Sequence, residues 1–334
     1  MLLYGCLTPI DFPVERNGRE LVVSAKLSTI PSQTIVSIGR TTELDRFPNP
    51  VIGAQVTVLD DQDNTWRFRH IGSGNYGIAD FQPLPGATYR LQIVIDRKTY
   101  ESLPQRMPDE AANARSYYEF RNEEVVSPDG TISSLPILDI LSDLDIPPSR
   151  PFIRISTSEV YVIRPTNFPD PFNSTPPDCF VSSRVNSQAI NLIDTRAIRS
   201  SRTARVASGS RNVDESFLLR HYFAVTAESC TPESFDYWSK VKVLVNQVGS
   251  IFDTPPAQLK GNIFSTTDTR EVVWGFFEVV NASQSGFDVF PSDLPVFFPD
   301  PCPYIEGKPL FEYPTKCIDC LSVQGSSIIP PPWF

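Results

Sequence analysis

Two cysteines three residues apart, Cys317 and Cys320, have the spacing that most directly suggests chemistry. Such a pair can hold a metal, exchange disulfides or staple the fold. A structural zinc site needs about four ligands. Only Cys302 lies nearby, because the two histidines, His70 and His221, are far away in the sequence. A thioredoxin-like site needs a helix behind its cysteines, and "CIDCLSVQGSS" has no helical pattern. We therefore expect no metal and no cofactor, and disulfides if the compartment is oxidising.

The composition indicates which elements must position these residues. The chain has 334 residues, 32 of them proline, and a formal net charge of -10. This length favours two domains, and frequent Val, Ile, Thr, Phe and Tyr favour strands over helices. The negative charge argues against general nucleic-acid binding, since that function needs a basic surface to neutralise phosphates.

Short strand-like segments bounded by Gly, Pro, Asn or Asp recur along the first third of the sequence. This pattern is typical of a β-sandwich, so we predict a mainly β chain with an immunoglobulin-like or transthyretin-like sandwich over residues 18–103. Residues 104–115 are polar and flanked by proline, and we predict a linker there. Residues 116–334 are predicted to form a second β-rich domain that carries one long helix.

That helix is predicted over residues 232–248. Thr231 is a suitable N-cap, Pro232 suits the first turn, and Gly249 can end the helix in a left-handed conformation. We expect its apolar face to pack against a sheet, with Trp238 buried. The residues of this face recur at three- and four-residue steps: Phe235, Trp238, Val241, Val245 and Val248.

A basic segment precedes the helix. Residues 196–211 hold five arginines and no acidic residue. This segment can bind an anionic partner, and the alternative is an exposed loop in an acidic protein. The arginines of this candidate anion or partner patch are Arg196, Arg199, Arg202, Arg205 and Arg211.

The first residues, "MLLYGC", resemble a bacterial lipobox, in which the cysteine is lipidated after signal cleavage. Leu3 lies three residues before Cys6, and the small residue Gly5 directly precedes it. A signal peptide also has a basic start and a longer apolar run, and this segment has neither. No stretch approaches the roughly 20 apolar residues that span a bilayer. We expect residues 1–17 to form a lipobox and tether, with Cys6 as the lipidation site.

Residues 18–103 resemble the carboxypeptidase regulatory-like domain. The motif "P-x-x-G-A-x-V-x-V" of that family matches residues 50–58, and "G-x-Y" matches residues 74–76. The motif "P-G-x-Y-x-L-x-I" corresponds to residues 85–93, with one extra residue before the tyrosine. The resemblance implies a scaffold without catalytic residues.

Residues 221–280 resemble a Bacteroidota lipoprotein family known as domain of unknown function 4249. Its aromatic helix motif corresponds to residues 235–238, its "G-N-I" to residues 261–263, and its "V-x-G-Y-F" to residues 273–276. An early cysteine of the family corresponds to Cys179, and its closing "C-x-D-C" to residues 317–320. The resemblance extends from Cys6 nearly to the end of the chain. It implies a surface lipoprotein, often encoded beside TonB-dependent receptors, without catalytic activity.

An exported location makes disulfides persistent, so we expect Cys317 to bond Cys320, or one of them to bond Cys302. Either bond would pin the tail onto the body. We expect a non-enzymatic lipoprotein at the outer membrane, facing the cell exterior. Its expected partners are the membrane, through the lipid anchor, and a β-barrel protein, in particular a TonB-dependent receptor. The expected role is an accessory binding subunit of that transporter, and the alternative is a structural subunit of a larger surface assembly.

Overall fold

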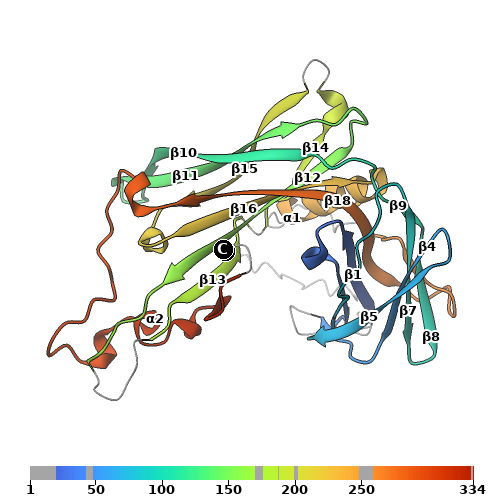
Figure 1. Ribbon diagram of the computed structural model, residues 1–334, viewed down its shortest axis with the longest axis horizontal. Coiled ribbons are helices and arrows are strands. Elements are labelled where there is room, and N and C mark those ends of the chain that lie inside the picture. Colours follow the sequence, from blue (N-terminus) through green and yellow to red (C-terminus); the bar gives the residue numbers. More distant parts are fainter. Residues whose placement is uncertain are drawn as a thin grey trace, which may run out of the picture.

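The computed structural model describes residues 20–42, 48–169, 176–186, 188–198, 202–247, 259–331 and 334. Strands make up 49% of the structure and helices 13%, which confirms the predicted mainly β class with one long helix. Figure 1 shows strands of the first third at one end, long strands of the middle and end above them, and one long helix between. No described helix has the length and apolar character needed to cross a bilayer.

Within the described part of the first 106 residues there are nine strands: β1 (Leu21–Ser28), β2 (Ile35–Arg40), β3 (Asn49–Pro50), β4 (Gln55–Asp60), β5 (Thr65–Gly72), β6 (Asn75–Gly77), β7 (Thr88–Ile95), β8 (Lys98–Ser102) and β9 (Gln105–Arg106). The remaining described strands are β10 (Asn113–Val126), β11 (Ile132–Asp145), β12 (Phe152–Ile163), β13 (Cys179–Arg184), β14 (Asn191–Asp194), β15 (Thr203–Asn212), β16 (His221–Cys230), β17 (Ile263–Ser265), β18 (Val273–Val289) and β19 (Ser326–Ser327). The α-helices are α1 (Pro232–Gln247) and α2 (Thr315–Ile318), and short 3-10 turns include η1 (Pro31–Gln33) and η3 (Glu215–Phe217).

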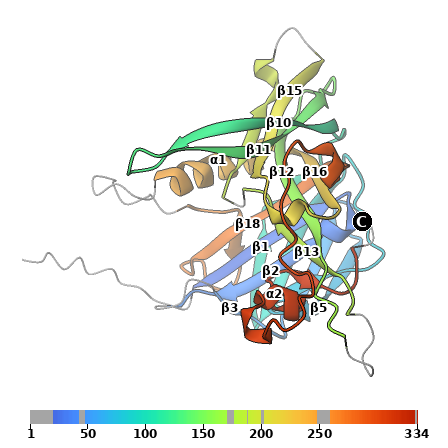
Figure 2. The same ribbon diagram turned by 90° about the vertical axis from the view of Figure 1, so that its left-hand side faces the viewer.

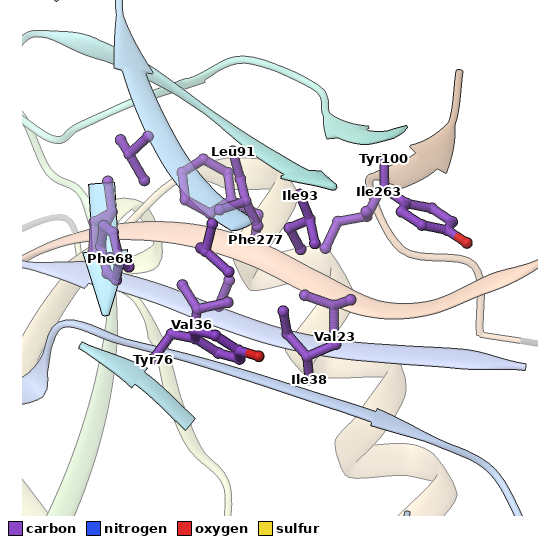
Figure 3. Close-up of a cluster of buried hydrophobic side chains, with 14 of the residues drawn as sticks. Val23, Val36, Ile38, Phe68, Tyr76, Leu91, Ile93, Tyr100, Ile263 and Phe277 are labelled. Carbon is purple, nitrogen blue, oxygen red and sulfur yellow. The ribbon is translucent and has the colours of Figure 1, made fainter. Parts of the chain in front are cut away.

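The first unit is a β-sandwich. One layer runs β6-β2-β1-β18 and the other runs β17-β8-β7-β4, with β5 pairing into both. Alternate side chains of β1, β2, β4 and β7 point inward because successive strand residues face opposite sides. The result is a buried apolar core in which Val23 and Ile38 face Leu91 and Ile93 (Figure 3).

Late segments of the chain complete this sandwich. The first half of β18 pairs in parallel with β1, with Val23 opposite Gly275, and β17 pairs with β8. Residues 18–103 therefore do not build the sandwich alone. The segment predicted as a linker, residues 104–115, is also packed, since Met107 and Ala112 are fully buried and β9 pairs with β7.

The second unit places two sheets face to face. The order β18-β16-β12-β13-β19 continues the sheet of the first unit, while β10, β11 and β15 form a separate three-stranded sheet. That separate sheet is the upper layer in both views (Figures 1 and 2). Apolar side chains from both layers meet between them, among them Ile140 of β11, Ile155 of β12 and Val225 of β16.

Helix α1 covers part of the continuous sheet. Its start is fixed by Thr231, whose hydroxyl accepts a hydrogen bond from the backbone N–H of Ser234, as an N-cap does. The ring of Phe235 stacks on Phe152 of β12 at 4.3 Å between centroids. The predicted helix 232–248 is therefore present as α1, while Val248 and Gly249 lie outside the described residues.

The family-like motifs "G-N-I" and "V-x-G-Y-F" pack directly on each other. The side-chain amide of Asn262 donates to the carbonyl of Phe277 and accepts from its N–H, both at 2.8 Å. A Cβ on Gly261 would lie 1.5 Å from the carbonyl oxygen of Gly275, so only glycine fits. These motif residues hold the segment before β17 against β18 and are structural.

Candidate ligand-binding groove

Strand alternation gathers polar side chains on one face of the continuous sheet. On β1, Val23 and Ala25 enter the first core, whereas Ser24 and Lys26 face the opposite side. On β12, Ile153 and Ile155 enter the second core, whereas Arg154 lies with Lys26. The same sheet thus has apolar faces that bury both cores and a polar face beneath α1.

Four charged side chains form a network on this face. The Lys26 ammonium lies 2.6 Å from a Glu228 oxygen. Arg154 contacts Glu228 at 2.6 Å and binds both oxygens of Glu278, at 2.8 and 3.0 Å. The side chains of Glu228 and Glu278 are only 2% and 7% exposed. Burial of carboxylates is costly unless they are paired. Here Lys26 and Arg154 pair with Glu228, and Arg154 also pairs with Glu278.

Helix α1 adds its own polar contacts to the network. The hydroxyl of Ser234 and the indole N–H of Trp238 both donate to Glu278, at 2.8 and 2.9 Å. The Arg154 guanidinium lies 4.6 Å from the centre of the Trp238 ring. Trp238 is half-buried, so the expectation of a buried core tryptophan is wrong. Its indole lies on the charge network, at the edge of a groove.

Electrostatics keep the network ionised. Burial opposes the charge on Glu228, but Arg154 and Lys26 outweigh it and lower the pKa of Glu228 to about 2. Burial likewise opposes the charge on Arg154, and the two glutamates outweigh it and raise the pKa of Arg154. Nearby Cys230 is the free cysteine among the described residues, and burial raises the pKa of its thiol to about 12. That thiol is therefore protonated and a poor nucleophile.

Two adjoining pockets lie over the network and form what we call the groove. The first has a volume of about 730 Å³; Trp238, Val241 and Val245 of α1 line it, together with residues 188–190. The second has about 460 Å³ and extends over β1 and β2 toward Asn75. Their shared lining residues are Ser24, Lys26, Ser156 and Arg184. Both volumes are within the usual range for ligand sites.

Two groups in the groove lack partners among the described residues. Arg184, at the end of β13, is exposed and forms no ion pair with any described carboxylate. The Oε1 atom of Gln33 is buried and has no hydrogen-bond partner within the described part of the chain. The exposed guanidinium of Arg184 is suited to contact an anionic ligand, and a buried polar atom without a partner, such as the Gln33 oxygen, is costly.

The predicted cysteine pair is oxidised, but its members do not bond each other. The disulfides are Cys302–Cys317 and Cys179–Cys320. The first is one of the expected alternatives. The second joins the chain end to β13 through Cys179, which the sequence offered only through the family resemblance. No cluster of three or more His, Cys, Asp or Glu side chains suited to a metal occurs among the described residues.

The tail is pinned onto the body through these bonds. The ring of Phe334 lies 5.2 Å from Phe180 of β13. Ile328 and Ile329 are 50% and 73% exposed, so they do not pack on the body. Trp333 lies outside the described residues.

The structure does not bring the described arginines of the basic segment into one patch. Arg196 pairs with Asp194, and Arg205 pairs with Glu119. Arg211 lies six residues after Arg205 on β15, which is about 20 Å at strand spacing. It pairs with Glu159. Arg202 forms no ion pair with a described residue, and Arg199 and the predicted lipidation site Cys6 lie outside the described residues.

The groove was missed at the level of sequence. Its signal is a single charged residue inside an otherwise apolar strand: Arg154 in "FIRIS", Glu228 in "FAVTAES" and Glu278 in "FFEVV". Each charge is unusual at a buried position unless it is paired. The sequence does not show that these three positions meet, because their pairing depends on the order of β12, β16 and β18 in the sheet.

A comparison with known families gives one match. A family model described as "Domain of unknown function (DUF4249)" covers residues 7–285, which include every residue that lines the groove. No curated protein matches the chain, and no solved structure matches it.

Proposed function

The chain belongs to the DUF4249 family, and from this premise we propose that it is an exported, lipid-anchored binding protein of an outer membrane. In this proposal it serves as an accessory subunit of a TonB-dependent transporter of Bacteroidota. Cys6 carries the lipid, the body faces the cell exterior, and the chain has no catalytic activity. The first sandwich, built as a carboxypeptidase regulatory-like scaffold, supports the ligand-binding sheet.

The observation that carries the proposal is the groove beneath α1. It combines a pocket of about 730 Å³, an ionised floor and the Arg184 side chain, which has no ion-pair partner among the described residues. Its floor comes from both units, through β1 of the first and β12 and β16 of the second. A groove of this kind suits selective binding, because fixed polar groups orient a ligand while the apolar helix wall contributes contact area.

The two disulfides support the exported location. Structural disulfides persist in oxidising compartments and are rare in the cytosol of most organisms. Here one disulfide closes a loop with a sequence separation of 141 residues and the other one of 15. Both lie away from the groove, as expected of structural bonds.

Native purification tests this proposal. A tagged copy is expressed in a Bacteroidota host, extracted from membranes with mild detergent and analysed by mass spectrometry. We expect acyl chains on Cys6 and a co-purifying β-barrel protein of the TonB-dependent class. Recovery from the soluble fraction, with an unmodified Cys6 and no barrel partner, would contradict it.

A structural subunit of a larger surface assembly is the second candidate, and the C-terminal segment favours it. Residues 297–329 hold nine exposed large apolar side chains, including Phe297 at 89% and Phe311 at 84% exposure. Exposed apolar surface of this kind often marks a protein–protein contact. If this role is correct, Phe297→Ser with Phe311→Ser releases a stable partner and leaves the monomer folded.

A further inference from the structure

We infer that the groove binds an acidic oligosaccharide, with its anionic group between Lys26 and Arg184 and its hydroxyl groups on the amide and hydroxyl side chains of the floor. This inference rests on the proposed binding function and specifies its ligand. Each pocket alone has the volume of a site for a drug-sized ligand. Two adjoining pockets therefore accommodate a chain of units rather than a single one.

The charged residues of the groove favour an anionic ligand. Lys26, Arg154 and Arg184 line it against two carboxylates, Glu228 and Glu278. Arg154 is saturated, since its contacts go to both carboxylates. Lys26 has one carboxylate partner and remains 27% exposed, and Arg184 has none among the described residues. The two available cations line both pockets, so they stand where the pockets join.

The uncharged residues that line the groove favour a ligand with hydroxyl groups. The Gln33 side chain lines the second pocket, and its amide can exchange hydrogen bonds with sugar hydroxyls. Close by, the Thr226 hydroxyl accepts from the amides of Gln33 and Gln284, at 3.4 and 3.2 Å. The other hydroxyl and amide side chains of the second pocket are Ser24, Ser32, Ser37, Asn75, Ser156, Thr157 and Ser158. The side chains of Trp238 and Val241 offer an apolar wall against which the C–H face of a sugar ring can lie.

The sheet argues against an extended peptide. A peptide of that kind usually adds to an open strand edge, where backbone groups are free. Along the floor, β1 pairs with β2 and β18, and β16 pairs with β18 and β12. Their backbone groups are occupied, so recognition depends on side chains. Side-chain hydroxyls and amides match a polyhydroxylated ligand better than a peptide backbone.

Binding is tested with the purified full chain on an array of free oligosaccharides, acidic and neutral, together with acidic peptides and lipopolysaccharide vesicles. Hits are measured by isothermal titration calorimetry. We expect an acidic oligosaccharide to bind. The affinity of its neutral analogue should be lower by roughly tenfold or more, since a charge-assisted hydrogen bond is lost. Binding to the vesicles alone would support the same acidic-sugar chemistry with a membrane-borne source.

Variants locate the site. Arg184→Gln is expected to weaken acidic binding to the level of the neutral analogue, and Gln33→Leu to weaken both ligands. Arg270→Gln is the matched control, because Arg270 is 92% exposed and lies outside the groove. The inference would be overturned if only peptides bound, or if no acidic saccharide bound either free or on vesicles. It would also be overturned if Arg184→Gln bound the acidic ligand as tightly as the wild type. A barrel partner found in the native purification would leave the proposed function standing in each of those cases.

Discussion

Glu228 gives the groove floor a dependence on pH. Its folded-state pKa is lowered from 4.5 to about 2, so its contribution to stability is complete above pH 4.5. That contribution is lost as the pH falls from 4.5 towards 2, because the carboxylate that Arg154 and Lys26 hold ionised is then protonated. We expect the urea midpoint of the protein to fall across this range.

The variant Glu228→Gln removes the titrating group. It should be less stable at pH 7, since Lys26 loses its carboxylate partner, and its stability should change less between pH 4.5 and 2. Glu124→Gln is the control, because Glu124 is exposed on β10 and should leave the profile unchanged. An identical pH profile for Glu228→Gln and wild type would contradict the assignment.

Trp238 is held by both packing and a hydrogen bond. Trp238→Ala should destabilise the purified monomer by about 2 kcal/mol, less than the 3 to 5 typical of a fully buried aromatic residue. Trp238→Phe keeps a ring over Arg154 and loses only the bond to Glu278, so it should cost about 1 kcal/mol. Thermal melting of the two variants measures both effects, and an unchanged curve for Trp238→Ala would exclude a structural role for this side chain.

Local signals in the sequence predicted local structure well. The cap at Thr231 and the apolar spacing of the helix correspond to α1, and the alternating segments correspond to strands. Burial of Trp238 could not be predicted, because periodicity shows which side chains share a face but not what covers that face. Here the helix wall is partly covered by charged floor residues from distant strands and is partly open to the groove.

At the scale of elements, Gly275 permits the parallel contact between β1 and β18. Its φ is +103°, and a Cβ there would lie 1.8 Å from the carbonyl oxygen of Val23. Gly275→Ala should therefore cost about 3 kcal/mol or more, since it adds a backbone clash to a left-handed conformation. Chemical denaturation of the purified protein measures this.

The variant Gly130→Ala separates the cost of the left-handed backbone conformation from the cost of the backbone clash. Gly130 also has a positive φ, +82°, but nothing lies within 4 Å of its potential Cβ. It should cost only about 1 kcal/mol. If both glycine variants lost the same free energy of unfolding, the close contact of Gly275 with β1 would not contribute to stability.

The pairing of strands that are distant in the chain could not be predicted from the sequence. Strands β17 and β18 follow α1 in the chain, yet they complete the first sandwich through β8 and β1. A division at residues 103 and 116 follows from composition alone and does not reveal these pairings. The groove depends on the same long-range pairing, so its floor residues could be noticed singly but not assembled.

At the scale of the whole molecule, the two disulfides should contribute unequally. Loop-closure entropy grows with loop length, so Cys179–Cys320 should contribute about 5 kcal/mol and Cys302–Cys317 about 3. Replacing each pair with alanine and comparing denaturation midpoints under oxidising conditions tests this order. Greater loss for the Cys302 and Cys317 replacement would show that local packing outweighs chain entropy.

The central claim is that the groove beneath α1 is occupied when the protein works at the cell surface. Hydroxyl-radical footprinting measures it most directly, because it reports the exposure of individual side chains in intact cells and in the purified monomer. Trp238 and Val241 should be labelled less in cells than in the monomer, whereas Arg270, outside the groove, should be labelled equally. Equal labelling of Trp238 in both samples would contradict the account.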